Sequence, residues 1–207
     1  FDWHRLALWS VLLLFAAFFL LPMYVMLTTS LKDMAQIRDG NLLAELTQDR
    51  QVRGYGLEID PIKISLCLER GVNVIEQDLD RGLDNFRTGS YDTVVMSQTL
   101  QAVRRSDLVI GEMLRVGHEG IVTFPNFGYW RHRLDILRGR MPVSKSLPYQ
   151  WYDTPNIHLC TVKDFEDLCA RVGAVILDES VLHGGRTVTM LPNLLGSLGV
   201  FRFRRAR

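Results

Sequence analysis

The chain has 207 residues, of which 47% are apolar, and its 24 basic and 23 acidic residues give a formal net charge of +1. That length suits one domain plus a smaller additional segment. The balanced charge argues against a broad electrostatic surface for nucleic acid. Three widely separated cysteines argue against a disulfide framework, so we expect reduced thiols, with Cys169 in the core.

Residues 6–27 contain no charged side chain and are apolar on every face of a helix. About 20 apolar residues span a bilayer, and Trp3, Trp9 and Tyr24 would lie near its two interfaces, where aromatic belts occur. Pro22 would kink such a helix without breaking it. The segment predicts one transmembrane helix that would hold the chain at the inner membrane. The alternative is a buried core helix.

From residue 39 onward, apolar runs alternate with helical patterns. Pro61 suits a first helical position, and Thr161 to Asp164 has the form of a capping box. Helices are expected over residues 61–70, over 108–116 and after Thr161, and each ends at a glycine before an apolar run: Gly71, Gly117 and Gly173. Strands are expected over residues 52–58, 72–78, 91–97, 120–124, 174–177 and 198–203. This alternation predicts an α/β fold of three layers, with a parallel sheet covered on both faces.

Polar side chains stand where three of the expected strands end, and ligands bind at this edge of such sheets. Glu58 could accept hydrogen bonds from both hydroxyls of a ribose, and Gln77-Asp78 could bind an adenine amino group. Ser97-Gln98 would supply a polar turn beside them. Together these positions predict an adenosine ligand, although Glu58 alone could equally be a helix cap.

The same positions resemble those of class I S-adenosylmethionine-dependent methyltransferases, and several stretches are similar to one family, the methionine-biosynthesis protein MetW. The stretches are residues 53–60, 71–75 and 94–101, with residues 124–158 as the most specific part. The resemblance covers residues 39–207. It implies a Rossmann-like methyltransferase sheet, S-adenosylmethionine as cofactor and homoserine O-acyltransferase as partner. The cofactor-binding positions that it implies are Gly40, Glu58, Ile59, Asp78, Leu79, Ser97 and Gln98.

The chain departs from the methyltransferase pattern at its start. That pattern opens with a strand and a turn of the kind Asp-x-Gly-x-Gly-x-Gly, of which residues 35–40 keep only Gly40. In this fold the first strand lies between the strands that end at Glu58 and Ser97. Its loss would leave backbone groups unpaired, at about 1–3 kcal/mol for each buried one. We therefore expect S-adenosylmethionine to bind weakly, through Glu58 and Asp78.

Residues 5–38 instead resemble the first membrane span of sugar-transporter permease subunits of the ATP-binding-cassette type. We therefore expect residues 1–38 to be a transmembrane segment and linker that arose by gene fusion or as an assembly artefact. Residues 39–207 would then be a MetW-like domain of the cytoplasmic type.

These features predict a MetW-type, methyltransferase-like protein that acts with homoserine O-acyltransferase in methionine biosynthesis. Fold alone does not decide whether a methyl group is transferred, and no residue has the pattern of a catalytic base. The alternative function is a non-enzymatic, membrane-tethered interaction module with a defective cofactor pocket.

Other patterns favour no second catalytic site. The histidines lack metal-ligand spacing, so no metal is expected. Cys160 lies near His158 but has no orienting acid in sequence, which argues against a nucleophile. A basic stretch lies beside Tyr129, Trp130 and Trp151, and the same segment contains Pro142, Pro148 and Pro155. Its basic residues are Arg131, Arg133, Arg138, Arg140 and Lys145. It predicts an irregular insert that binds a partner or covers substrate, rather than a nucleic-acid interface.

Overall fold

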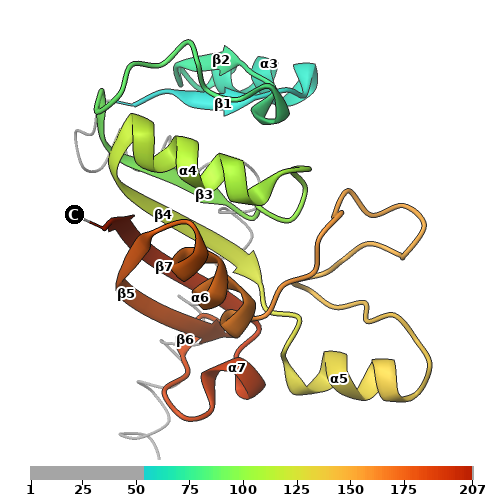
Figure 1. Cartoon of the computed structure of the whole chain (residues 1–207). Helices are drawn as coiled ribbons and strands as arrows, with labels where there is room; N and C mark the ends of the chain where they lie inside the picture. Colours follow the sequence, from blue (N-terminus) through green and yellow to red (C-terminus); the bar gives the residue numbers. More distant parts are fainter. Residues whose placement is uncertain (1–53, 207) are drawn as a thin grey trace, which may run out of the picture. The chain divides into compact units, whose positions relative to one another are not determined.

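The computed structural model describes residues 54–206, which form two compact units (Figure 1). One comprises residues 54–56 and 60–75, and the other comprises residues 57–59 and 76–206. The predicted membrane segment, Gly40 and the expected domain boundary at residue 39 lie outside the described residues. No helix within residues 54–206 is long and apolar enough to cross a bilayer.

Helix α3 (Pro61–Glu69) follows the signals expected from the sequence. The Asp60 side chain caps it by accepting a hydrogen bond from the Ile62 amide at 2.9 Å, and Gly71 follows it with a φ of +69°. None of the residues of α3 is buried. Strands β1 (Gly56–Glu58) and β2 (Val74–Glu76) form a two-stranded sheet and are shorter than expected.

The larger unit contains a five-stranded sheet in the order β3-β4-β7-β5-β6. Its strands are β3 (Tyr91–Ser97), β4 (Gly117–Pro125), β5 (Ala174–His183), β6 (Arg186–Thr187) and β7 (Leu198–Arg205). Only β3 and β4 pair in parallel among these strands. The prediction of a parallel sheet is therefore wrong for the C-terminal half. Between β5 and β7 the chain forms only a hairpin with β6 and the four-residue helix α7 (Pro192–Leu195). A parallel arrangement of β5 and β7 would need a longer crossover connection, usually an α-helix.

The core of this unit lies on one face of the sheet, under α4 (Ser106–Val116) and α6 (Val162–Arg171). The rings of Phe124, Phe165 and Phe201 meet there with centroids 4.8–5.7 Å apart, and Cys169 is buried beside them as expected. The other face carries exposed side chains, including Val95 and Arg202. The predicted helical cover on that second face is not found among the described residues of this unit.

Two glycines and one cap mark the end of α4 and both ends of α6. Thr161 and Asp164 form the predicted capping box, with Asp164 Oδ2 accepting from the Thr161 amide at 2.8 Å. Gly173 ends α6 with a φ of +70°, as expected. Gly117 instead opens β4 in an extended conformation. A Cβ at Gly117 would lie 2.8 Å from Val94 Cγ2, so glycine is needed there for close packing between β3 and β4.

Residues 127–159 leave the carboxyl end of β4 and return at α6; we call this segment the insert. In Figure 1 it extends away from the sheet as α5 (Trp130–Leu137) followed by irregular loops. The irregular part was predicted from its prolines, whereas α5 was not. Its apolar residues at positions 130, 134 and 137 have helical spacing, which was the available signal.

Candidate functional site

Gln98 directly follows β3, at the edge where the parallel strands β3 and β4 both end. It adopts a φ of +47°, which is uncommon for a residue other than glycine. Its amide donates to the Thr123 carbonyl at 2.9 Å and lies 3.1 Å from Thr123 Oγ1. Ser97 Oγ lies 3.3 Å from the same hydroxyl. Strained backbone of this kind clusters at functional sites, so Ser97 and Gln98 stay candidates.

Gln101 is a candidate that the sequence analysis missed. Its side chain is 6% exposed, and its Nε2 donates to the Gln98 carbonyl at 2.8 Å. Its Oε1 is buried and has no hydrogen-bond partner among the described residues. A buried acceptor without a partner is costly, and the donor of a bound ligand would satisfy it. No sequence pattern distinguishes this glutamine from a surface residue.

Glu58 and Asp78 stand at the ends of β1 and β2. The Gln77 amide donates to the Glu58 carbonyl at 3.1 Å, which places the two strand ends side by side. Glu58 Oε1 accepts from the Ile59 amide at 2.9 Å. Asp78 Oδ1 accepts from the Asp80 amide at 3.0 Å and thereby caps η1 (Leu79–Arg81). Asp78 Oδ2 also lies 3.5 Å from Arg81 Nε. Each carboxylate oxygen can accept more than one hydrogen bond, so an existing contact does not prevent a carboxylate from binding a ligand.

The turn that contains Asp78 is joined to the turn that follows β3. Asp80 Oδ1 accepts from the Arg104 amide at 2.7 Å, and Leu79 packs against the core cluster that includes Met96 and Leu100. Ile59 is 57% exposed beside Glu58. The structure therefore brings Asp78 and Leu79 to the segment that holds Ser97, Gln98 and Gln101. Gly40 lies outside the described residues.

The chemistry of this set fits the adenosine end of S-adenosylmethionine. Two carboxylates can accept hydrogen bonds from ribose hydroxyls and from an adenine amino group, and Ile59 and Leu79 offer apolar surface to a base. The unpartnered Gln101 Oε1 is a further acceptor.

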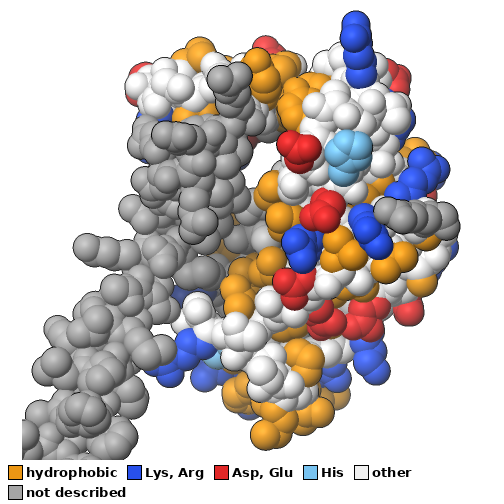
Figure 2. Space-filling view, turned by 90° about the vertical axis from the view of Figure 1, so that its left-hand side faces the viewer, with side chains coloured by type: hydrophobic (Ala, Val, Ile, Leu, Met, Phe, Trp, Pro, Cys, Tyr) orange, Lys and Arg blue, Asp and Glu red, His pale blue; other side chains and the backbone are white. Residues whose placement is uncertain are grey.

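The other candidate sites do not gain support. Burial raises the pKa of the Cys160 thiol to about 12, which disfavours the thiolate that a nucleophile requires. No group of His, Cys, Asp and Glu side chains within residues 54–206 could hold a metal ion. On the face shown in Figure 2, basic and acidic side chains alternate instead of gathering in a patch of one sign.

Comparison with known proteins gives a family and a fold. The family of the methionine biosynthesis protein MetW matches residues 27–203, so the match begins 12 residues before the boundary expected at residue 39. The bifunctional methionine biosynthesis protein MetXA/MetW of Rhodopirellula baltica is 33% identical over 182 residues. That alignment covers 81% of this chain and 29% of the relative, so the chain spans less than a third of the relative's length.

Two solved structures share the fold at low sequence identity. An S-adenosylmethionine-dependent methyltransferase from Thermotoga maritima has a TM-score of 0.55 at 16% identity, over 80% of this chain and 79% of that one. The cyclase SpnF has a TM-score of 0.57 at 16% identity, over 81% of this chain and 72% of that one. These likenesses show a methyltransferase-like α/β fold with a mixed sheet. The family match covers most of the chain, and the chain therefore belongs to the MetW family of methionine biosynthesis proteins.

Proposed function

We propose that this methyltransferase-like protein of methionine biosynthesis acts in a complex with homoserine O-acyltransferase. The observation that carries the proposal is the relative whose name joins MetXA and MetW in one bifunctional chain. Two activities that are fused in one protein commonly work side by side, and the partner is the one that the family resemblance implies. No observation on the described residues favours the membrane-tethered alternative.

Co-purification tests the complex. The full chain, untagged, is mixed with the tagged homoserine O-acyltransferase encoded in the same genome, and the mixture is passed over an affinity column and then a sizing column. We expect the two chains to elute together in a fixed ratio. Separate elution at micromolar concentrations of both proteins would contradict the proposal.

We further propose that Glu58 and Asp78 hold the adenosine end of S-adenosylmethionine. When bound, the cofactor supplies an electrophilic methyl group. Each hydrogen bond between a ribose hydroxyl and a charged carboxylate is worth about 1.5–3 kcal/mol, which corresponds to roughly 10- to 100-fold in affinity. We therefore expect Glu58→Ala to weaken calorimetric binding of S-adenosylmethionine by at least about tenfold.

Glu69→Ala is the matched control, because Glu69 is an exposed carboxylate at the end of α3. It should leave the affinity for S-adenosylmethionine unchanged. Equal affinities of the Glu58 and Glu69 variants would mean that the adenosine end binds elsewhere.

A further inference from the structure

The outer surface of the insert carries an unusual concentration of exposed apolar side chains. Leu137 is 81% exposed, Trp151 72%, Tyr152 70% and Ile157 57%. Large exposed apolar groups that lie together mark interaction sites, and tryptophan and tyrosine are enriched among the residues that dominate binding energy. The rings of Trp151 and Tyr152 meet edge to face, with centroids 5.7 Å apart.

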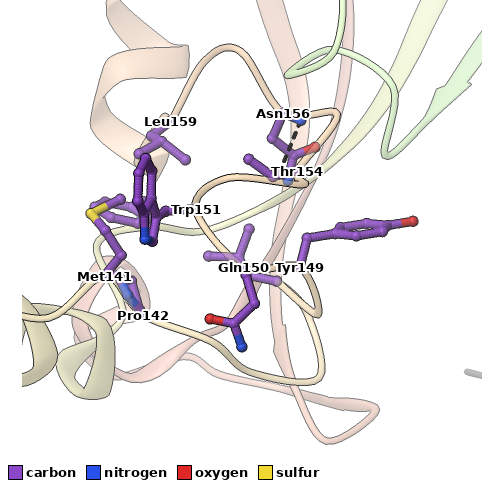
Figure 3. Close-up of a pocket in the computed structure, with 10 residues that line it drawn as sticks. Met141, Pro142, Tyr149, Gln150, Trp151, Thr154, Asn156 and Leu159 are labelled. Atoms are coloured by element: carbon purple, nitrogen blue, oxygen red, sulfur yellow. Dashed lines mark hydrogen bonds between the residues drawn. The ribbon is translucent and has the colours of Figure 1, made fainter.

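A shallow hollow with a cavity volume of about 40 Å³, open to solvent, lies within the insert, and Trp151 is one of its lining residues. In Figure 3, Met141, Pro142, Trp151 and Leu159 gather at one side of it, whereas Tyr149 points away from them. Seven of its ten lining residues are apolar or aromatic, and Gln150, Thr154 and Asn156 are polar. An apolar side chain of a partner can pack on such a shallow surface beside an exposed tryptophan.

The inner side of the insert is held in place by buried contacts. His132 is 1% exposed, and its two ring nitrogens lie 3.2 Å from the Asn126 carbonyl and 3.1 Å from Ser144 Oγ. Leu147 is buried as well. The outer apolar groups are therefore presented on a folded support, so binding them would cost little ordering entropy.

Charge restricts the kind of partner. The insert has five basic and two acidic side chains, so it carries +3, whereas the rest of the chain has 19 basic and 21 acidic residues. Within residues 54–206, Arg131, Arg140 and Lys145 have no carboxylate at salt-bridge distance. An exposed apolar surface on a segment of net positive charge fits a protein surface that presents an apolar side chain flanked by carboxylates.

We infer that the insert is the docking surface for homoserine O-acyltransferase, which would present an apolar side chain within an acidic patch. The inference rests on the proposed function and adds the location of the interface. The returning loop of the insert also touches the candidate cofactor site. The amides of Ile157 and His158 both donate to the Gln101 carbonyl, at 2.8 and 3.0 Å. The insert is therefore hydrogen-bonded directly to Gln101, the residue whose buried Oε1 has no partner among the described residues.

The test uses the full chain and the acyltransferase of the same genome, with their affinity measured by calorimetry. The variant Trp151→Ala/Tyr152→Ala removes the exposed aromatic pair, and we expect it to weaken binding by at least about 30-fold. Its matched control is Met190→Ala, because Met190 is equally exposed at 72% but lies outside the insert. Both variants should keep the wild-type melting temperature, since neither removes a buried group.

A second pair of variants tests the charge. Arg131→Glu/Arg140→Glu should weaken the complex and reduce its salt dependence. Arg186→Glu, at an exposed position in β6, should change neither. Wild-type affinity in both insert variants would overturn the inference and leave the proposed complex standing.

If the wild-type chain does not bind the acyltransferase, the proposed function and the inference both fall. The remaining possible occupant of this surface is a second copy of the chain. Light scattering on the chain alone measures its mass and so tests for a dimer. A wild-type dimer that Trp151→Ala/Tyr152→Ala converts to a monomer would assign the surface to a second copy of this chain and overturn the inference.

Discussion

Single residues decide which chemistry the described part of the chain can perform, and Cys160 is the clearest case. The sequence places it two residues after His158, but the imidazole of His158 is directed to the Arg104 carbonyl, at 3.1 Å from Nε2. Burial raises the pKa of Cys160 to about 12. At pH 8 a thiol with that pKa is ionised to about one part in ten thousand. This partly buried side chain, which packs against the core, is therefore unsuited to act as a nucleophile.

We therefore predict that Cys160 resists alkylation in the native chain. With iodoacetamide at pH 8, its labelling should be at least about 100-fold slower than in urea, where its pKa returns to about 8.5. Peptide mass spectrometry reads each cysteine separately, and Cys67, half exposed on α3, is the internal reference. Equally fast labelling of Cys160 in the native and unfolded chain would restore the nucleophile hypothesis.

His132 links stability to pH, because burial lowers its pKa in the folded chain. Above pH 6.5 the imidazole is neutral in both states. As the pH falls below 6.5, the unfolded chain binds a proton before the folded chain does, so stability is lost. The loss is at most about 1.4 kcal/mol per pH unit, until the folded pKa is reached.

We expect the stability difference between wild type and His132→Gln to shrink between pH 7.5 and pH 5.5. Urea unfolding at the two pH values measures it, with His118→Gln, at an exposed position of β4, as the control. A difference that is the same at both pH values would show that the pKa of His132 does not differ between the folded and the unfolded chain.

At the scale of elements, the sequence predicted which segments form helices and strands more reliably than how they pair. The bounds of β3 and the capping box of α6 follow from local pattern and local hydrogen bonds. The antiparallel placement of β7 between β4 and β5 depends on contacts between distant segments. The apolar pattern of a strand does not indicate whether the strand runs parallel or antiparallel to its neighbours. For the same reason Glu58 and Asp78 were recognisable at strand ends, whereas Gln101 was not.

Gly120 shows why β4 contains a glycine in its middle. It pairs with Phe203 of β7, and a Cβ at Gly120 would lie 2.7 Å from the Phe203 ring. That ring is fully buried in the core, so moving it would disturb the packing around it. We predict that Gly120→Ala destabilises the chain by about 1–3 kcal/mol, as other overpacked cores do.

Gly111→Ala is the matched control for this change, because a Cβ at Gly111, in α4, meets no atom within 4 Å. Alanine in a helix interior should stabilise by up to about 1 kcal/mol. Urea unfolding at pH 7.5 measures both variants. Equal stability of the two variants would mean that Phe203 can move to make room.

At the scale of the whole molecule, the strands of the described residues fall into two separate sheets. β1 pairs with β2, and β3 pairs with β4, and no described strand joins β1 to β3. The family match begins at residue 27, 12 residues before the domain boundary expected from the sequence.

Helices α3 and α4 should also differ in local stability. Helix α3 buries none of its residues, and β1 and β2 have three residues each. Helix α4 buries five side chains, and it packs on β3 and β4 within a sheet whose longest strands have eight to ten residues. Because local opening costs little where few apolar contacts are broken, the amides of α3 should open far more often than those of α4.

We therefore predict that the amides of residues 65–69 in α3 exchange hydrogen at least about 100-fold faster than those of residues 110–116 in α4, after correction for intrinsic rates. Native-state hydrogen exchange read by NMR or mass spectrometry measures both segments in one sample, so concentration and pH cannot account for a difference. If the Glu58 carboxylate holds S-adenosylmethionine, adding this ligand should slow hydrogen exchange at the amides that directly follow Glu58. The reason is that the ligand binds the folded segment and not the locally opened one. Equal protection of α3 and α4 without ligand would mean that α3 has packing partners beyond those that its exposed side chains indicate.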